Sequence, residues 1–246
     1  MSKIYDALEN ARKEGAKIAE SVSSPTVALP VYSEQSPVDI DMEQEMVTLY
    51  QMITVSLPDI DHPSILFIGS CSNEGASTVA QELAKMVSLR LGKTVLLIDF
   101  DRSHPAHHIY ANIQPEKHLE TAETGDLIKN TLCRVEDSSL YVMPLFLKTM
   151  ATTRTIDSAR GYGFWEPLKE RFDLIIVDSP PGTMFPDGAG LASQVDGVIL
   201  VVEAEKTRWQ IVLSVKEKII KSGGNLLGVV FNKRRLHIPQ WLYNRL

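Results

Sequence analysis

Short, strongly apolar runs alternate with helix-like segments over most of this chain. The runs lie at residues 64–70, 94–101, 140–146, 173–182, 196–204 and 225–232. They are rich in Val, Ile and Leu, which is typical of parallel strands buried on both faces by crossover helices. The sequence therefore predicts an α/β fold with a doubly wound, mostly parallel sheet. In such sheets, ligands bind at the carboxyl ends of the strands.

The N-terminal part of the chain differs in composition from the rest. Residues 1–20 place apolar side chains near one face, which predicts an amphipathic helix. Residues 21–41 hold three prolines and five serines without a sustained hydrophobic period, which is typical of a flexible linker. The main domain is expected to span residues 42–246, beginning with a helix over residues 43–57.

Composition narrows the functional classes. The chain of 246 residues has a formal net charge of −6, which argues against bulk nucleic-acid binding. Its two cysteines, Cys71 and Cys133, have no metal-ligand spacing and indicate no disulfide framework. No apolar run approaches the roughly 18 residues of a membrane span, and the N-terminus is too polar for a signal peptide. We therefore expect a cytoplasmic protein that reaches a membrane only through a partner.

The segment SCSNEGAST at residues 70–78 connects an apolar run to a helix-like segment. In such a loop, main-chain N–H groups converge at the N-terminus of the following helix and suit a bound anion. The candidate anion-binding residues are Asn73, Glu74, Gly75, Ala76, Ser77 and Thr78. Taken alone, the segment fits a tight strand-to-helix turn equally well.

Acidic side chains follow two further apolar runs. Asp99 and Asp101 come at the end of one run, and Asp178 comes at the end of another. Because parallel strands bring their carboxyl ends to one edge, we expect these acids near the loop. Carboxylates and the hydroxyl of Ser77 suit Mg²⁺, held directly or through water. The combination predicts a nucleotide phosphate site with magnesium.

With these motifs, the chain resembles the bacterial tyrosine kinases of capsule and exopolysaccharide assembly, which are relatives of the Min and Par partition ATPases. The resemblance rests on SNEGAST, LLIDFD followed by Pro105, LYVMP, FDLIIVDSPPG and GVVFN, and covers roughly residues 45–232. The opening MSKIYDALENAR is similar to the start of cytoplasmic members that lack a membrane span. The resemblance implies a P-loop NTPase fold of the SIMIBI type.

The same resemblance implies a role for each matching residue. The loop would bind the phosphates of ATP or ADP, and Ser77, Asp99 and Asp178 would hold Mg²⁺. Asp101 would assist near the acceptor, which makes it a candidate catalytic residue together with Asp99 and Asp178. Asn232 would lie near the adenine. The implied partner is a membrane-embedded protein that controls polysaccharide chain length or polymerisation.

The chain departs from the family pattern at three places. The family loop P-G-E-G-K-S/T carries a lysine where this chain has Ala76. The subunit-contact motif Glu-x-x-Arg-x-x-Arg becomes Glu45, Thr48 and Gln51, so a homo-oligomer would lack the usual arginine contacts. The C-terminal tail has one tyrosine, Tyr243, where family kinases carry a cluster that they autophosphorylate. The chain therefore lacks a loop charge, a ring contact and the usual substrate.

Other polar features have simpler explanations. His104, His107 and His108 have no cysteine or carboxylate at a recognisable ligand spacing, so solvated loop histidines are favoured over a metal site. Arg102 either approaches a bound phosphate or lies exposed beside Asp101, and the exposed position is favoured. The basic and aromatic C-terminal tail either contacts an anionic membrane or a partner, or folds onto its own domain. Nucleic acid is the least favoured ligand.

Three functions remain open from the sequence. The leading hypothesis is a nucleotide-binding protein with degenerate kinase machinery that regulates or scaffolds exopolysaccharide assembly. The second is a working tyrosine kinase that compensates for Ala76 with a residue from elsewhere in the chain or from a partner subunit. The third is a partition-like or structural binding module with a vestigial site. A lysine restored at position 76 separates the first two, because it either creates activity or raises an activity that already exists.

Overall fold

The computed structural model describes residues 26–27, 42–100, 132–135, 138–144, 162–183 and 190–234. Outside the described residues lie the predicted leading helix, most of the linker, Asp101, Arg102, the three histidines and residues 235–246 of the C-terminal tail, with Tyr243. The expectations for these parts stay predictions.

The described strands form one eight-stranded sheet in the order β1-β4-β5-β3-β6-β2-β7-β8. Their bounds are β1 Thr26–Val27, β2 Ser64–Gly69, β3 Val95–Asp99, β4 Cys133–Val135, β5 Leu140–Pro144, β6 Leu174–Ser179, β7 Gly197–Glu203 and β8 Leu226–Asn232. Neighbouring strands pair in parallel except β4 and β5, which are antiparallel. The predicted doubly wound, mostly parallel sheet is confirmed.

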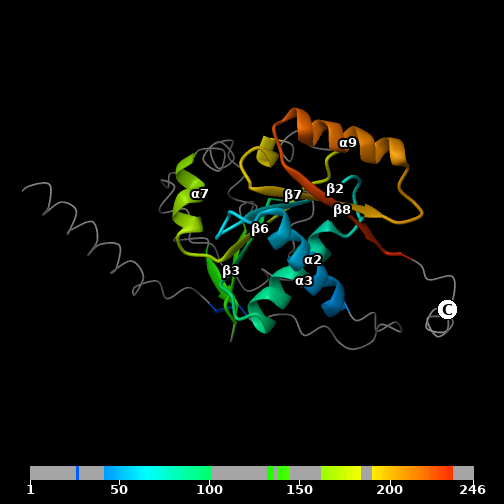
Figure 1. The fold of residues 1–246 in the computed structure, drawn as a ribbon. Coiled ribbons are helices and arrows are strands. Elements are labelled where there is room, and N and C mark those ends of the chain that lie inside the picture. The colour runs from blue at the N-terminus through cyan, green and yellow to red at the C-terminus, as the bar shows by residue number, and fades with distance from the viewer. Residues whose placement is uncertain are drawn as a thin grey trace, which may run out of the picture.

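Helices cover both faces of this sheet (Figure 1). The helices α2 (Met42–Ser56) and α3 (Ala76–Arg90) lie on one face, and α7 (Tyr162–Lys169) and α9 (Trp209–Lys221) lie on the other. In the described part of the chain, no helix has both the length and the apolar character that a membrane span requires.

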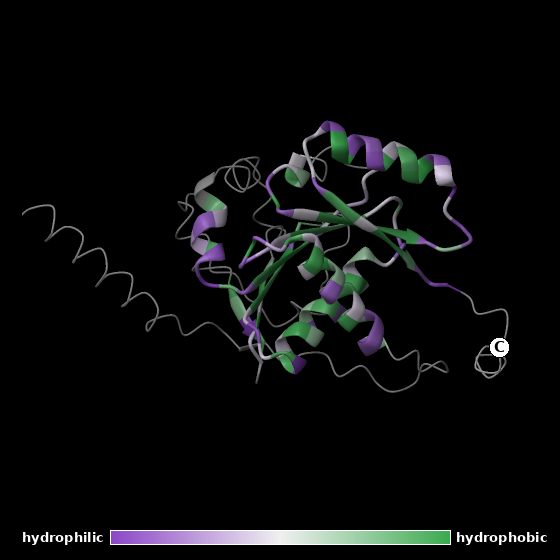
Figure 2. Ribbon diagram, in the orientation of Figure 1, coloured by the Kyte–Doolittle hydropathy of each residue, from purple (hydrophilic) through white to green (hydrophobic). Residues whose placement is uncertain are grey.

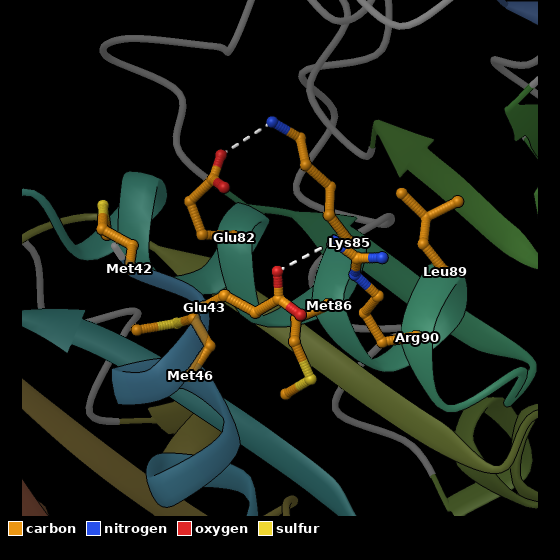
Figure 3. A pocket seen from close by; sticks show the side chains of 8 residues that line it. All are labelled: Met42, Glu43, Met46, Glu82, Lys85, Met86, Leu89 and Arg90. Carbon is orange, nitrogen blue, oxygen red and sulfur yellow. Dashed lines mark hydrogen bonds and ion pairs between the residues drawn. The ribbon is translucent and has the colours of Figure 1, made fainter. Parts of the chain in front are cut away.

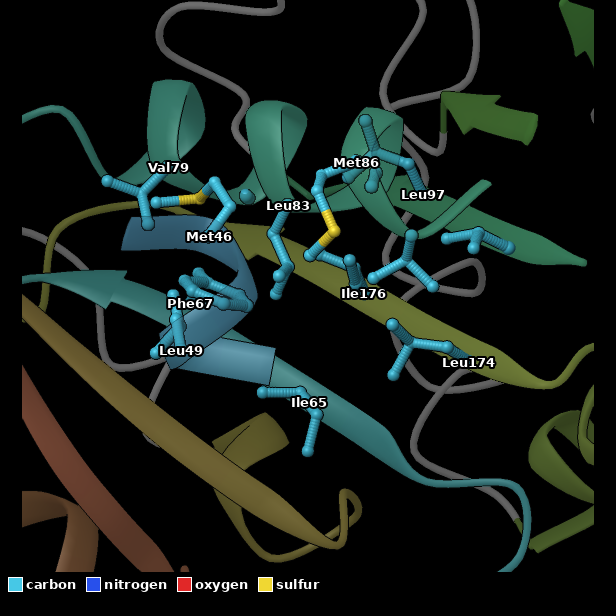
Figure 4. Packing of buried hydrophobic residues seen from close by; sticks show 14 of the residues in the cluster. Met46, Leu49, Ile65, Phe67, Val79, Leu83, Met86, Leu97, Leu174 and Ile176 are labelled. Atoms are coloured by element: carbon cyan, nitrogen blue, oxygen red, sulfur yellow. The ribbon is translucent and has the colours of Figure 1, made fainter. Parts of the chain in front are cut away.

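The sheet divides the apolar core into two layers, because successive strand residues point to opposite faces. In β2, Ile65 and Phe67 pack with α2 and α3, whereas Leu66 and Ile68 pack on the side of α7 and α9. Figure 4 shows Leu83 of α3 over the face that carries Ile65 and Phe67. The central strands are accordingly apolar along their length in Figure 2. Burial on both faces explains why these strands appear in the sequence as unbroken apolar runs.

The six apolar runs correspond to β2, β3, β5, β6, β7 and β8. The two remaining strands, β1 and β4, were not predicted from the sequence. β4 has three residues, in which Arg134 is exposed between two buried neighbours, and this is too short to establish a period. β1 lies within the predicted linker, where Thr26 and Val27 pair with β4, so the linker contributes two residues to the edge of the sheet.

We expect the apolar layer beneath α3 to contribute strongly to stability. Leu83→Ala removes a side chain with no exposed surface and should lower the free energy of unfolding by about 2–5 kcal/mol. Leu89→Ala, on the same helix but 54% exposed, should change it by less than about 0.5 kcal/mol. Urea denaturation of both variants measures the difference, and equal losses would contradict the assigned packing.

Candidate functional site

The loop between β2 and α3 contains two residues in the left-handed backbone region. Gly75, which caps the helix, has φ 89°, and Asn73 has φ 64°. Glycine and asparagine are the residues that adopt this region most readily. Asn73 stands where the loop of the family that the chain resembles has a glycine, and its φ lies in the region that glycine adopts readily. The chain can therefore turn sharply from the end of β2 into α3.

The N-terminal end of α3 presents free hydrogen-bond donors. The first helical bond of the ladder runs from the Val79 N–H to the Gly75 carbonyl at 3.0 Å, so the N–H groups of Ala76, Ser77 and Thr78 have no acceptor within the helix. The first turn also carries no acidic side chain that would neutralise the positive end of the helix dipole. This end of α3 can therefore accept an anion.

The Glu74 side chain holds the loop from inside and does not face outward. It is 2% exposed, and its carboxylate accepts hydrogen bonds from the Ser70 hydroxyl and the Cys71 N–H, both at 2.8 Å. The Thr207 hydroxyl, just before α9, donates to the same carboxylate. Only the main chain of Glu74 is therefore available to a ligand. Its side chain is a structural part of the loop that the sequence did not reveal.

The end of β8 lies against the loop between β2 and α3. The Asn232 amide donates to the Glu74 carbonyl at 2.9 Å, and a Cβ atom on Gly75 would lie only 2.2 Å from the Asn232 Nδ2 atom. The next residue, Lys233, donates from Nζ to the Asn73 carbonyl. The structure thus brings Asn232 to the loop, while its expected position near an adenine stays a prediction. Lys233 was predicted only as part of a basic tail.

A carboxylate lies close to Lys233. Glu203 ends β7, and its Oε2 atom is 3.0 Å from the Lys206 Nζ atom and 3.7 Å from the Lys233 Nζ atom. The hydrogen bond from Lys206, together with the charge of Lys233, lowers the pKa of Glu203 below its ordinary value. Glu203 is therefore charged at neutral pH and is a second partner for the Lys233 ammonium.

Two of the three predicted site acids are described, and they lie side by side at the edge of the sheet formed by the carboxyl ends of the strands. Asp99 of β3 and Asp178 of β6 are register partners and are 3% and 4% exposed. β6 is also the neighbour of β2, which leads directly into the loop with Ser77. Asp101, the third predicted acid, lies outside the described residues.

This donor set fits a magnesium ion. Two buried carboxylates and a hydroxyl are hard oxygen ligands, and Mg²⁺ commonly takes one or two carboxylates and completes its shell with water and phosphate oxygens. In the described part of the chain, no group of three or more His, Cys, Asp or Glu side chains could hold a metal ion alone. The described residues therefore offer an ion at this edge two carboxylates and one hydroxyl, and water or phosphate oxygens are suitable further ligands.

The residues that follow β6, described at positions 180–183 and called the post-β6 segment below, are hydrogen-bonded to the base of the loop. The Gly182 N–H donates to the Gly69 carbonyl and the Thr183 hydroxyl donates to the Ser70 carbonyl, both at 2.8 Å. Gly182 also touches α9, because the Lys218 Nζ atom donates to its carbonyl at 3.3 Å. A Cβ atom at Gly182 would lie 2.6 Å from Val215 Cγ1 of α9. Hydrogen bonds and close packing therefore connect the loop to the post-β6 segment, and the post-β6 segment to α9.

A separate hollow of about 210 Å³ lies between α2 and α3 (Figure 3). It is lined by Met42, Glu43, Met46, Glu82, Lys85, Met86, Leu89 and Arg90. An ion pair between Arg90 and Glu43 at 2.9 Å bridges the two helices. The hollow lies along the flank of α3, not at the N-terminal end that faces the loop, so it is not part of the candidate phosphate site.

The position of Ala76 is the main defect of the site. Ala76 is the first residue of α3, half-buried and packed against the core layer of α2 and α3. Its methyl group offers a bound phosphate neither charge nor hydrogen bond. The main chain of the loop therefore suits a phosphate, whereas the charged side chain expected at this position is missing.

Comparison with known proteins places the chain beside kinases. No protein-family model matches it. The tyrosine-protein kinase CpsD of Streptococcus agalactiae is 31% identical over 166 residues, which cover 65% of this chain and 70% of that protein. The tyrosine-protein kinase YwqD of Bacillus subtilis is 25% identical over 228 residues, covering 84% of this chain and 86% of that protein.

A solved structure supports the fold. The kinase domain of the Escherichia coli tyrosine kinase ETK superposes with a TM-score of 0.64, covering 80% of this chain and 79% of that chain. At 16% identity, this likeness shows the fold alone.

Removing the internal carboxylate should loosen the loop. Glu74→Ala leaves the Ser70, Cys71 and Thr207 donors without their acceptor and should lower the free energy of unfolding by about 1–3 kcal/mol. Hydrogen exchange at the amides of residues 71–78 should accelerate as well. Glu217→Ala is the control, because that side chain is 64% exposed on α9 and should change stability by less than about 0.5 kcal/mol. Identical behaviour of the two variants would refute the structural role of Glu74.

Proposed function

The chain belongs to the bacterial tyrosine-kinase family, and we propose that it is a nucleotide-binding member with degenerate catalytic machinery that regulates or scaffolds exopolysaccharide or capsule assembly. The observation that carries this proposal is a loop with the backbone of a phosphate site but Ala76 in place of its lysine. The kinase relatives support a kinase-like role. The missing lysine argues that phosphoryl transfer is weakened.

The loss of the lysine should weaken nucleotide binding less than it slows phosphoryl transfer. One charged hydrogen bond contributes about 1.5–3 kcal/mol, so its loss weakens binding about ten- to hundredfold when binding depends on it. The N–H groups at the start of α3, the helix dipole and magnesium would still hold phosphates. Phosphoryl transfer needs the same charge on oxygens whose charge shifts in the transition state, so it should lose more.

Each candidate site residue in the described part of the chain has a proposed part in nucleotide binding. The N–H groups of residues 73–78 would surround the phosphates. Ser77, Asp99 and Asp178 would hold Mg²⁺, which would neutralise phosphate charge when bound. Asn232 fixes the loop through the Glu74 carbonyl and would thereby position it for the nucleotide.

The output of the site is proposed to be conformational. The post-β6 segment is bonded to the loop at Gly69 and Ser70 and to α9 through Lys218, so a phosphate that shifts the loop would also shift this segment. A ligand changes such an equilibrium only by its difference in affinity for the two arrangements. The proposed receiver is a membrane-embedded polysaccharide chain-length or polymerisation protein. Self-association is proposed to be weaker than usual, because the exposed Glu45, Thr48 and Gln51 of α2 include no arginine.

A working tyrosine kinase is the second candidate. Asp99 and Asp178 favour it, because both acids proposed to bind Mg²⁺ lie side by side on neighbouring strands. This candidate requires a cation from elsewhere to replace the lysine at Ala76. A partition-like or structural module with a vestigial site is the third candidate, and it requires no nucleotide dependence.

The first test is calorimetric titration of MgATP and MgADP into the full chain. We expect binding by the wild type, tightening of about ten- to hundredfold in Ala76→Lys, and clear weakening in Asp178→Asn because an amide cannot balance the magnesium charge. Asp59→Asn, at an exposed position, is the control. Wild-type protein that binds no nucleotide would contradict the proposal. Binding gained in Ala76→Lys would then indicate an intact loop that no longer serves nucleotide.

Phosphotransfer separates the first two candidates. We expect the wild type to show little or no tyrosine autophosphorylation, and Ala76→Lys to raise it by about 10²–10³-fold if the remaining machinery is competent. Transfer of radiolabelled γ-phosphate, followed by mass spectrometry of phosphotyrosine, measures both. Strong transfer by the wild type would instead support a working kinase.

A further inference from the structure

The residue after β8 is held in an unusual conformation beside the loop. Lys233 has φ 56°, in the left-handed region that residues other than glycine and asparagine rarely adopt. Its main-chain N–H donates to the Asn232 Oδ1 atom at 2.9 Å. This arrangement turns the chain at the end of β8 and sends the lysine side chain back toward the loop between β2 and α3.

Two consecutive residues thereby bind two consecutive loop carbonyls. Asn232 donates to the Glu74 carbonyl at 2.9 Å, and the Lys233 ammonium donates to the Asn73 carbonyl. The Lys233 Cε atom also lies 4.0 Å from a Cβ atom placed on Gly75, the residue just before Ala76. The lysine therefore runs alongside the part of the loop that should enclose a phosphate.

The Lys233 ammonium remains available to an added anion. Its side chain is 48% exposed, and Glu203 is its carboxylate partner at 3.7 Å, longer than the 3.0 Å between Glu203 and Lys206. A polyphosphate carries more negative charge than this single shared carboxylate. Among the described lysines and arginines, Lys233 is the residue whose charged group donates to a loop carbonyl.

We propose that Lys233 serves as the lysine of this phosphate loop, supplied from the end of β8 in place of the side chain missing at Ala76. It positions the loop through the Asn73 carbonyl and lends its positive charge to the phosphates of a bound nucleotide. This inference rests on the proposed nucleotide binding. It assigns Lys233 a positioning and charge-supplying role.

The test is a double-mutant cycle in the full chain, measured by MgATP and MgADP titration. Lys233→Met, which keeps the length of the side chain without its charge, should weaken binding about five- to tenfold for a half-exposed charge. Lys216→Met, on the exposed surface of α9, should change binding less than about twofold. In the Ala76→Lys background, Lys233→Met should have less effect than in the wild type, because a restored lysine supplies the same charge.

A conservative variant and a salt series separate charge from simple packing. Lys233→Arg should recover most of the affinity, because it retains the charge. The difference between wild type and Lys233→Met should also shrink as ionic strength rises. A Lys233→Met affinity equal to that of Lys216→Met would overturn the proposal. So would equal losses from Lys233→Met with and without the lysine at position 76.

Failure of the proposed function can be distinguished from failure of this inference. If neither the wild type nor Ala76→Lys binds nucleotide, the proposed function is wrong, and hydrogen exchange without nucleotide decides the positioning role. Faster exchange at the amides of residues 73–78 in Lys233→Met than in Lys216→Met would support the contact between Lys233 and the loop. Equal exchange would overturn it.

Discussion

The parallel hydrogen bonding of β3, β6, β2 and β7 is the constraint on which the site depends. These strands pair in continuous register and are buried on both faces, so their carboxyl ends cannot shift independently. The register places Asp99 beside Asp178 and places both next to the strand that leads into the loop. A site formed in this way is set by the whole sheet and does not require local adjustment of flexible side chains.

The loop depends on a second set of interactions that do not involve nucleotide. The buried Glu74 carboxylate holds the Ser70 hydroxyl, the Cys71 N–H and the Thr207 hydroxyl, while Asn232 holds the Glu74 carbonyl. These bonds link the loop to the start of α9 and to the end of β8. A buried carboxylate is tolerated only when such donors surround it. The shape of the loop is therefore stabilised from within the protein.

Much of the fold was predictable because the central strands are apolar on both faces, so each appears in the sequence as an unbroken run of apolar residues. β2 and β6 are examples, since every residue of each strand is buried. The short strands β1 and β4, neighbours at one end of the sheet, gave no such signal, because two or three residues cannot show a period. The placement of Asp99 and Asp178 at one edge followed from the same logic, whereas their chemical roles stay predictions.

The contacts around the loop could not be predicted in the same way. Glu74 was expected to contribute through its main chain, and nothing in the sequence indicated that its side chain would meet Thr207, 133 residues away. In the sequence, Lys233 is one of several basic residues near the C-terminus, and only the structure places it, at the end of β8, beside the loop. Both are contacts between segments remote in sequence, and hydrophobic periodicity carries no information about such pairs.

The separation between loop shape and loop charge explains how a lysine can be lost from such a site without loss of the fold. In this chain the sharp turn depends on Asn73 and Gly75, and the internal bonding depends on Glu74 and Asn232. The side chain at position 76 is only a methyl group, packed against the core layer of α2 and α3. A change at this position would therefore alter the charge offered to the proposed phosphate ligand and leave the structural supports in place. A regulatory protein that needs only occupancy would tolerate that change, whereas an enzyme that must stabilise a transition state would need the charge from elsewhere.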